Sequence, residues 1–182
     1  MTLCAGNIES FDFAKPIGIG IVESAINLTK LVLKEKPSFL FFVGTAGSYG
    51  RHTIFDTIQS HKASNIELGF LNNLCYTPLE PFIETMPPHV SRGTQNSSPI
   101  VNSSNYITTD VVLGQKMLEK NIELENMEFF SVLSVAKNFN LPCSGLFVVT
   151  NYCNENAHRD FIQNHAQAKE LIALHVKNTL LF

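Results

Sequence analysis

The sequence predicts an α/β fold, a single-domain three-layer α/β/α arrangement with a mixed, mostly parallel central sheet. Two continuous apolar runs, 38–43 and 143–150, are typical of strands that are buried on both faces. Segments with apolar residues at helical spacing, 20–35, 127–139 and 156–181, alternate with these runs or follow them. Helices that alternate with strands favour a mostly parallel sheet covered by helices.

Glycines delimit the N-terminal elements. Residues 2–5 form a short predicted strand that stops at Gly6. A tight turn at Gly18-Ile19-Gly20 begins the helix 20–35, and because a third glycine is missing, a dinucleotide-binding loop is disfavoured there. The apolar face expected of this helix comprises Ile21, Val22, Ala25, Ile26, Thr29, Val32 and Leu33.

The middle of the chain has weaker patterns. Segments 54–58 and 66–75 have the apolar character of strands. A stretch at about 77–105 is rich in proline, serine and asparagine, and we expect it to be a loop or flap. Asp110 is expected to cap a short helix that runs to about Lys120.

Length and composition limit the classes of function. The 182 residues fit one domain, 1–182, which can form a core without disulfide or metal support. The net charge of −3 gives no basic surface for nucleic acid. Because only 16% of residues are charged and 45% are hydrophobic, we expect a homo-oligomer in which a partner subunit covers apolar surface. No apolar run reaches the ~18 residues of a membrane span, and residues 1–6 do not resemble a signal peptide.

The cysteines and histidines do not predict a metal site. The four cysteines lack metal-ligand spacing and are expected to be buried, reduced thiols of a cytoplasmic protein: Cys4, Cys75, Cys143 and Cys153. His158, His165 and His175 lie on the last predicted helix, but no set of cysteines or carboxylates near them completes a metal site.

Polar residues follow the two buried strands. The turn Gly44-Thr45-Ala46-Gly47 comes directly after the strand 38–43, and its backbone N–H groups can converge on an oxygen-rich ligand. Downstream, Asn126-Met127-Glu128 opens the helix 127–139, and Asn151 follows the strand 143–150. The sequence therefore predicts a polar site at the ends of these strands.

The order of these motifs resembles the nucleoside phosphorylase and nucleosidase family, which includes purine nucleoside phosphorylases and methylthioadenosine/S-adenosylhomocysteine nucleosidases. In that family a Thr-Gly-Ile-Gly-type turn, a helix, Lys-Pro and a Gly-Ser-Ala-Gly-type turn occur in this order. Here the corresponding segments are Ile17–Gly20, a helix, Lys36-Pro37 and Gly44–Gly47. Asn126-Met127-Glu128 resembles the family's Glu-Met-Glu segment. The chain resembles a shortened member, with fewer residues before the Gly-Ile-Gly turn.

The resemblance implies how a nucleoside would be bound. Glu128 would accept hydrogen bonds from both ribose hydroxyls, and Met127 would lie beneath the ribose. Tyr106 would stack on the base, and Phe147 would contribute main-chain contacts to it. The residues alone also allow structural roles, such as a glutamate favoured by the helix dipole and an ordinary core methionine.

The resemblance also implies a place for the second reactant. Thr45, Gly6 and Gly47 would hold phosphate or water, and Glu9 would activate the water in a hydrolytic enzyme. The alternatives are a hydroxyl that stabilises the turn and a solvated loop carboxylate.

Two positions depart from the family pattern. Asn151 stands where nucleosidases and bacterial-type phosphorylases carry an aspartate that donates a proton to purine N7; an asparagine can only donate a hydrogen bond. A branch of the family that acts on 6-oxopurines has asparagine here. Phe42 stands in the place of a phosphate-binding arginine, and the alternative cations near the site are Arg51, His52 and Arg92.

The expected activity is therefore cleavage of the N-glycosidic bond of a purine nucleoside, with Glu128 and Asn151 as catalytic residues. Because Asn151 matches the 6-oxopurine branch, phosphorolysis is favoured, with phosphate as a possible co-substrate and no other cofactor. The alternatives are hydrolysis and a nucleoside-binding homologue with weak or no turnover.

Overall fold

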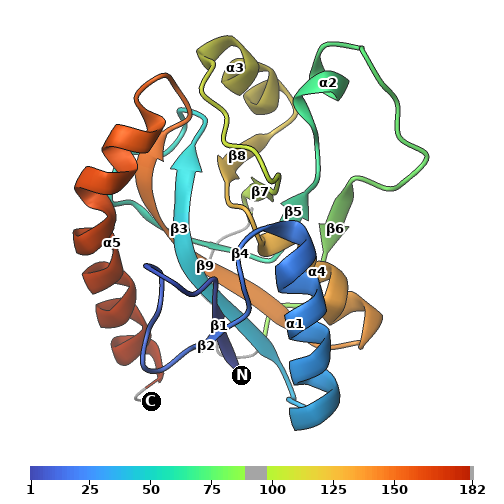
Figure 1. The fold of residues 1–182 in the computed structure, drawn as a ribbon, viewed down its shortest axis with the longest axis vertical. Helices are drawn as coiled ribbons and strands as arrows, with labels where there is room; N and C mark the ends of the chain where they lie inside the picture. The colour runs from blue at the N-terminus through green and yellow to red at the C-terminus, as the bar shows by residue number, and fades with distance from the viewer. Residues whose placement is uncertain (89–97, 181–182) are drawn as a thin grey trace.

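In the computed structural model, which describes residues 1–88 and 98–180, one mixed sheet lies between helices (Figure 1). Within these residues the strands are β1 (Thr2–Cys4), β2 (Lys15–Pro16), β3 (Leu40–Ser48), β4 (Thr57–Ser60), β5 (Lys62–Ser64), β6 (Phe82–Glu84), β7 (Ile100–Asn102), β8 (Ile122–Glu125) and β9 (Cys143–Tyr152). The helices are α1 (Gly20–Glu35), α2 (Leu68–Leu71), α3 (Val111–Glu119), α4 (Phe129–Asn138) and α5 (Ala157–Leu180).

Strand β3 is central to the sheet. It pairs in parallel with β1 and β9 and, at its end, antiparallel with β8. The order along the sheet is β2-β1-β3-β8-β7-β5-β6, while β9 pairs with β3 and β4. This arrangement confirms the predicted mixed, mostly parallel sheet.

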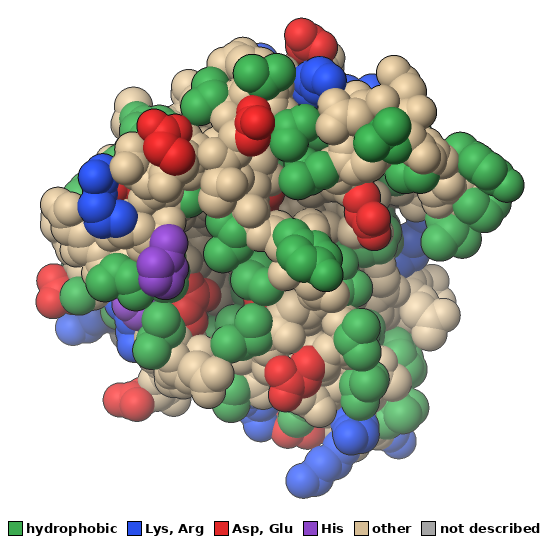
Figure 2. All heavy atoms as spheres, turned by 45° about the horizontal axis from the view of Figure 1, so that its top comes forward, with side chains coloured by type: hydrophobic (Ala, Val, Ile, Leu, Met, Phe, Trp, Pro, Cys, Tyr) green, Lys and Arg blue, Asp and Glu red, His purple; other side chains and the backbone are tan. Residues whose placement is uncertain are grey.

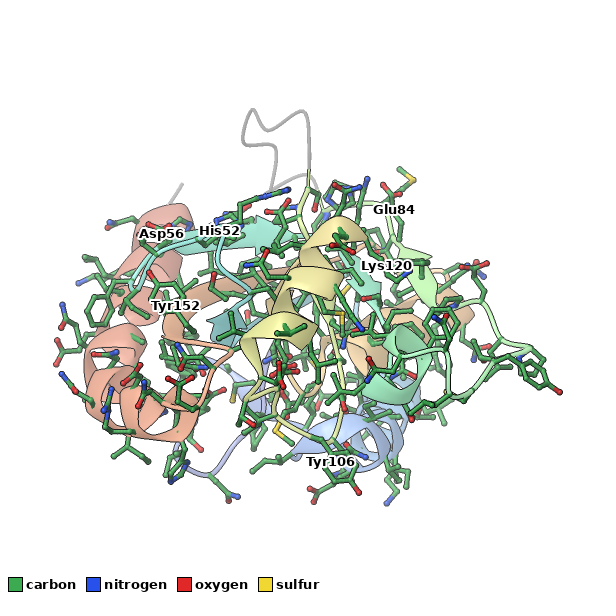
Figure 3. The ribbon with its side chains drawn as sticks, turned by 90° about the horizontal axis from the view of Figure 1, so that it is seen from above. His52, Asp56, Glu84, Tyr106, Lys120 and Tyr152 are labelled. Atoms are coloured by element: carbon green, nitrogen blue, oxygen red, sulfur yellow. The ribbon has the colours of Figure 1, made fainter. Side chains whose placement is uncertain are left out.

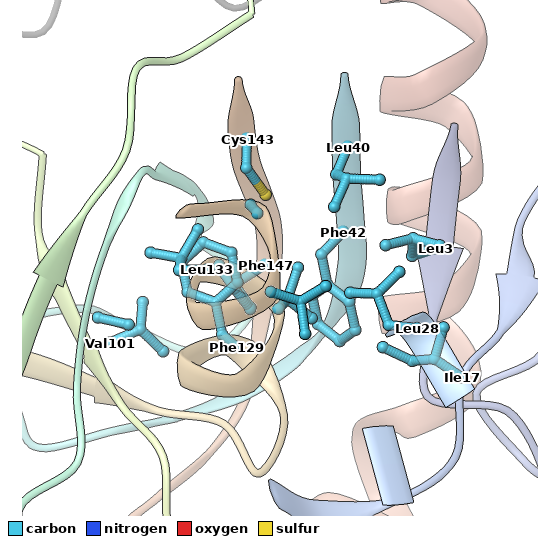
Figure 4. Close-up of a cluster of buried hydrophobic side chains, with 14 of the residues drawn as sticks. Leu3, Ile17, Leu28, Leu40, Phe42, Val101, Phe129, Leu133, Cys143 and Phe147 are labelled. Atoms are coloured by element: carbon cyan, nitrogen blue, oxygen red, sulfur yellow. The ribbon is translucent and has the colours of Figure 1, made fainter. Parts of the chain in front are cut away.

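The two faces of the sheet have separate cores. α1 and α4 pack on one face and α5 on the other (Figure 1). On the α1/α4 side, Phe42, Phe129 and Phe147 are fully buried and their rings contact one another (Figure 4). On the α5 side, Val148 packs with Ile172 and Val176. The predicted three-layer α/β/α fold is confirmed.

Both buried strands extend further than the sequence predicted. β3 continues through Gly44–Gly47, which was predicted as a turn, because these residues pair with β9. The register shifts between Ala46 and Gly47, so a strand irregularity takes the place of a turn. β9 likewise includes Asn151, which was expected to follow the strand.

The helix predicted at 20–35 is present with these bounds, but its buried face is only partly the predicted one: Val32 is buried as predicted and Ala25 packs against the core. The buried positions of α1 are Gly20, Ser24, Leu28 and Val32, whereas Val22, Ile26 and Leu33 are exposed. Two of these buried positions, Gly20 and Ser24, carry small residues, which a hydrophobic pattern does not mark as buried.

The middle of the chain contains the remaining differences. Residues 66–75 were predicted as a strand, but they contain α2 instead. The helix capped by Asp110 is α3, and the Asp110 carboxylate accepts from the N–H groups of Val112 and Leu113. All four thiols are free and three are buried, whereas Cys75 is exposed. Among the described residues, no helix is long and apolar enough to cross a membrane.

Candidate functional site

A cavity of about 320 Å³ lies where β1, β3, β8 and β9 end. Its volume is within the range of small-molecule sites, and the carboxyl ends of strands are the usual place for ligands in α/β sheets. It is lined by Ala5, Gly6, Ile8, Glu9, Ile19, Thr45, Ala46, Gly47, Ile107, Glu125, Asn126, Met127, Glu128, Thr150, Asn151, Ala157, His158 and Phe161. On one face of the molecule, Figure 2 shows hydrophobic side chains gathered around a hollow, with acidic and histidine side chains beside it.

Glu9 and Thr45 form a buried polar pair in the cavity wall. The Glu9 N–H donates to the Gly6 carbonyl over 2.9 Å, which folds the loop after β1 back over β3. The Glu9 carboxylate accepts a hydrogen bond from the Thr45 hydroxyl. Burial raises the pKa of Glu9, and the hydrogen bond from Thr45 opposes this increase. The carboxylate is therefore poised to take up a proton.

Glu128 presents a second buried carboxylate to the cavity. Its Oε1 accepts from the Gly20 N–H at the start of α1 over 2.9 Å. Burial raises the pKa of Glu128 to about 7; the Gly20 hydrogen bond opposes this and the nearby charge of Glu9 adds to it. A carboxylate held in this way can accept hydrogen bonds from ligand hydroxyls.

The Asn126 side chain connects the strand that carries Thr45 to the segment that carries Glu128. Its Oδ1 accepts from the N–H groups of Glu128 and Phe129, each over 3.0 Å. Its Nδ2 donates to the Thr45 carbonyl over 3.1 Å. The Asn126 side chain is buried, and its bonds join segments that line the cavity.

Asn151 faces the cavity from β9. Its Oδ1 accepts from the Thr150 hydroxyl over 2.9 Å, and its Nδ2 donates to the Tyr152 carbonyl over 3.2 Å. An amide nitrogen has two protons, so one remains for an acceptor on a ligand. Gly47 makes room for this side chain, since a Cβ there would lie 3.0 Å from Asn151 Nδ2.

The remaining wall is mostly apolar. Ile8, Ile19, Met127 and Phe161 line the cavity from four separate segments of the chain. Such a surface suits the faces of a flat ring or an aliphatic substituent, while the few polar groups fix orientation.

A third carboxylate, Glu125, holds the segment between β7 and α3 against the cavity. It accepts from the Thr108 N–H (2.9 Å), the Thr108 hydroxyl (2.5 Å) and the Tyr49 hydroxyl (2.7 Å). These bonds fix the position of Ile107, which lines the cavity directly before Thr108.

The structure brings most of the predicted site residues together. Seven of them line the one cavity: Gly6, Glu9, Thr45, Gly47, Met127, Glu128 and Asn151. They come from distant parts of the sequence, so their convergence is a property of the fold.

Two predicted base-binding residues are placed elsewhere. Phe147, predicted to contact the base through its main chain, does not line the cavity, and its side chain is fully buried against Phe42 and Phe129 on the α4 side of the sheet. Tyr106 is 79% exposed and does not line the cavity; Figure 3 shows it at the outer edge of the molecule. Its neighbour Ile107 lines the cavity instead.

The cavity lining contains no lysine or arginine among the described residues. Arg51 and His52 each pair with Glu123 at 2.7 Å, away from the lining. Arg92, the third alternative cation, lies outside the described residues. Phe42, in the place of the family's arginine, packs in the core.

Several lining residues were missed by the sequence analysis. Asn126 belongs to the recognised segment Asn126-Met127-Glu128 but was given no role, and Glu125 directly precedes that segment; the hydrogen bonds of the folded chain reveal the contacts of both. His158 and Phe161 lie three residues apart in the first turns of α5, and this spacing places them on one side of the helix.

Comparisons with solved structures show a shared fold. An aspartate-to-asparagine mutant of the Helicobacter pylori methylthioadenosine nucleosidase, with 5′-methylthioadenosine in its active site, matches 92% of this chain and 78% of its own, with a TM-score of 0.79 and 20% identity. Native Helicobacter pylori futalosine hydrolase gives the same values. The Streptococcus pneumoniae MTA/SAH nucleosidase in complex with 8-aminoadenine covers 92% and 79%, with a TM-score of 0.75 and 16% identity.

These matches confirm the predicted resemblance at the level of the fold, which is that of the nucleosidases. No protein-family profile matches the sequence. No curated protein sequence matches it either.

The raised pKa of Glu128 predicts a pH-dependent stability. Between pH 4.5, the ordinary pKa, and about 7, the folded protein keeps a proton that the unfolded chain has lost, so the free energy of unfolding falls as pH rises. Glu128→Gln has no such proton. Its free energy of unfolding, relative to that of wild type, should therefore rise by about 3 kcal/mol as the pH increases across this range.

Urea unfolding of both proteins from pH 4.5 to 8 checks this prediction, with the exposed Glu119→Gln on α3 as a control for the loss of a carboxylate outside the cavity. A difference between Glu128→Gln and wild type that does not change with pH would contradict the raised pKa.

Proposed function

We propose that this protein hydrolyses the N-glycosidic bond of a purine nucleoside. The observation that carries the proposal is the convergence of the Glu9–Thr45 pair, the Glu128 carboxylate and the Asn151 amide on one cavity. Each has a chemically distinct task in such a reaction: activating water, holding the sugar and facing the base. The shared fold of nucleosidases and futalosine hydrolase supports the same class of reaction.

The charges of the cavity favour water over phosphate as the second reactant. Three carboxylates line it, those of Glu9, Glu125 and Glu128, and no lysine or arginine of the described chain lines it. A phosphate beside Glu9 would meet negative charge without a compensating cation, which is unfavourable in a buried site. Water has no such cost, and Glu9 can accept its proton.

The proposed reaction is dissociative. Glu128 accepts hydrogen bonds from the ribose hydroxyls while the bond between C1′ and the purine nitrogen lengthens. The electron pair of this breaking bond goes to the purine. Water then forms the new bond to C1′ and transfers a proton to Glu9. Asn151 donates a hydrogen bond to the purine as negative charge develops on it. Because an amide cannot give up a proton, the departing base takes its proton from solvent.

This function predicts base release without phosphate. Purified protein incubated with inosine, guanosine, adenosine or 5′-methylthioadenosine should release free purine in phosphate-free buffer, and added phosphate should not accelerate the release. Glu9→Gln keeps the shape of the side chain but cannot accept the proton of the attacking water. We therefore expect kcat to fall at least ~100-fold, the usual contribution of a general base.

The measurement is chromatography of the free base over time, with Glu119→Gln expected to match wild type. Release that requires phosphate would overturn the hydrolytic assignment in favour of phosphorolysis. Full activity in Glu9→Gln would overturn the role of Glu9.

A second candidate function is nucleoside binding with little or no turnover. Asn151 favours it, since an asparagine leaves the site without a proton donor for the base. The solved structure of a nucleosidase with an aspartate-to-asparagine mutation, which holds 5′-methylthioadenosine in its active site, is consistent with binding by such a site.

Asn151→Asp distinguishes the two candidates. A protonated aspartate can donate a proton to the leaving base, so turnover should rise at least tenfold, which corresponds to about 1.4 kcal/mol of barrier. If wild type binds 5′-methylthioadenosine in calorimetry without releasing adenine and only Asn151→Asp releases it, the binding function is correct. Asn154→Asp, on the turn after β9 and outside the lining, is the matched control. Unchanged rate and affinity in Asn151→Asp would show that Asn151 does not face the base.

A further inference from the structure

Asn126 contacts both halves of the candidate active site through one side chain. Its Nδ2 donates to the Thr45 carbonyl, and its Oδ1 accepts from the N–H groups of Glu128 and Phe129. These partners lie 81, 2 and 3 residues away in the sequence, so the amide joins the middle of β3 to the start of α4.

The bonds continue beyond Asn126 in both directions. Through its hydroxyl, Thr45 donates to Glu9, which is the proposed acceptor of the water proton. Through its carboxylate, Glu128 accepts from Gly20 at the start of α1. Asn126 is therefore the link between the residues that handle water and the residue that holds the sugar.

An amide is suited to this position because it donates and accepts at the same time. The Thr45 carbonyl requires a donor, and the two N–H groups require an acceptor. An ionised carboxylate at this position could keep the two acceptor bonds but would place a negative oxygen against the Thr45 carbonyl. In the family segment that this chain resembles, the corresponding residue is glutamate, so the link through asparagine is a feature of this chain.

We propose that Asn126 is a positioning residue that sets the distance between the Glu9–Thr45 pair and Glu128, and that this distance controls the rate of glycosidic bond cleavage. The inference rests on the proposed hydrolytic function. It assigns Asn126 no contact with the reacting atoms. Glu128 keeps its bond to Gly20 without Asn126, so substrate affinity should change little. The water, by contrast, is held from the β3 side, and a small misplacement of reacting groups can lower a rate by about 100-fold.

Two variants separate the bond to the Thr45 carbonyl from the bonds to the Glu128 and Phe129 N–H groups. Asn126→Asp, assayed at pH 8, retains an acceptor for the Glu128 and Phe129 N–H groups and loses the donor to Thr45. Asn126→Ser also retains a side-chain oxygen that can accept from these N–H groups but adds no charge, so it distinguishes loss of the bond to Thr45 from charge repulsion. The matched control is Asp110→Asn, the reverse exchange at the cap of α3, where the side chain also accepts from the N–H groups two and three residues ahead.

We expect kcat for base release to fall at least tenfold in both Asn126 variants while KM stays within about threefold of wild type, and Asp110→Asn to retain both values. Hydrogen exchange provides a readout that does not depend on activity. Amides of Thr45–Ser48 should exchange at least tenfold faster in both Asn126 variants, whereas the Glu128 and Phe129 amides stay protected in Asn126→Asp.

Wild-type kcat or unchanged exchange at Thr45–Ser48 in both Asn126 variants would overturn the proposal. If wild type releases no base from any nucleoside, the proposed function fails, and the exchange rates alone decide whether Asn126 holds β3 in place. Loss of kcat in Asn126→Asp but not in Asn126→Ser would assign the effect to charge and also overturn the proposal.

Discussion

The candidate site depends on the close approach of side chains to the backbone of β3. A Cβ at Gly44 would lie 3.3 Å from Glu9 Oε2, and one at Gly47 would lie 3.0 Å from Asn151 Nδ2. Both distances are tighter than usual packing, so larger residues would displace the groups that face the cavity. The two glycines leave room for the Glu9 carboxylate of the loop after β1 and for the Asn151 side chain of the neighbouring strand β9.

Two carboxylates at this site, those of Glu9 and Glu128, are buried, and removing a carboxylate from water costs free energy. Glu9 and Glu128 are both shielded from water, and burial raises the pKa of each. The Thr45 hydroxyl and backbone N–H oppose this effect for Glu9, and the Gly20 N–H and the Asn126 side chain oppose it for Glu128. Each carboxylate keeps lone pairs that no protein donor occupies, and these are suited to ligand hydroxyls and to a water molecule. Functional sites commonly retain such local instability because the same groups bind the ligand.

Much of the fold could be predicted because its signals are local. The apolar runs of β3 and β9 and the cap of α3 at Asp110 are visible in a few consecutive residues. The strands β2, β5 and β6 are only two or three residues long, and pairing partners far away in the sequence define them, so no local pattern marked them. The buried face of α1 was predicted only in part: Val32 is buried as expected, but the small residues Gly20 and Ser24 are buried while Val22 and Ile26 are exposed.

The candidate site was predictable to the extent that its residues belong to motifs. Glu128, Thr45 and Asn151 follow recognisable segments, and the structure gathers them around one cavity. Tyr106 and Phe147 were placed on the base by their positions along the chain, Tyr106 through its side chain and Phe147 through its main chain, but neither residue lines the cavity. The contacts of Asn126 and Glu125 join segments separated in the sequence, so only the folded chain reveals them.

The most direct test of this account is a crystal structure of Glu9→Gln, in which turnover should be slow, soaked with 5′-methylthioadenosine. We predict that the nucleoside occupies the cavity, with its ribose hydroxyls about 2.5–3.0 Å from the Glu128 carboxylate and its purine facing Asn151 Nδ2. A nucleoside bound elsewhere, or one whose sugar lies away from Glu128, would contradict the assignment of this cavity as the active site.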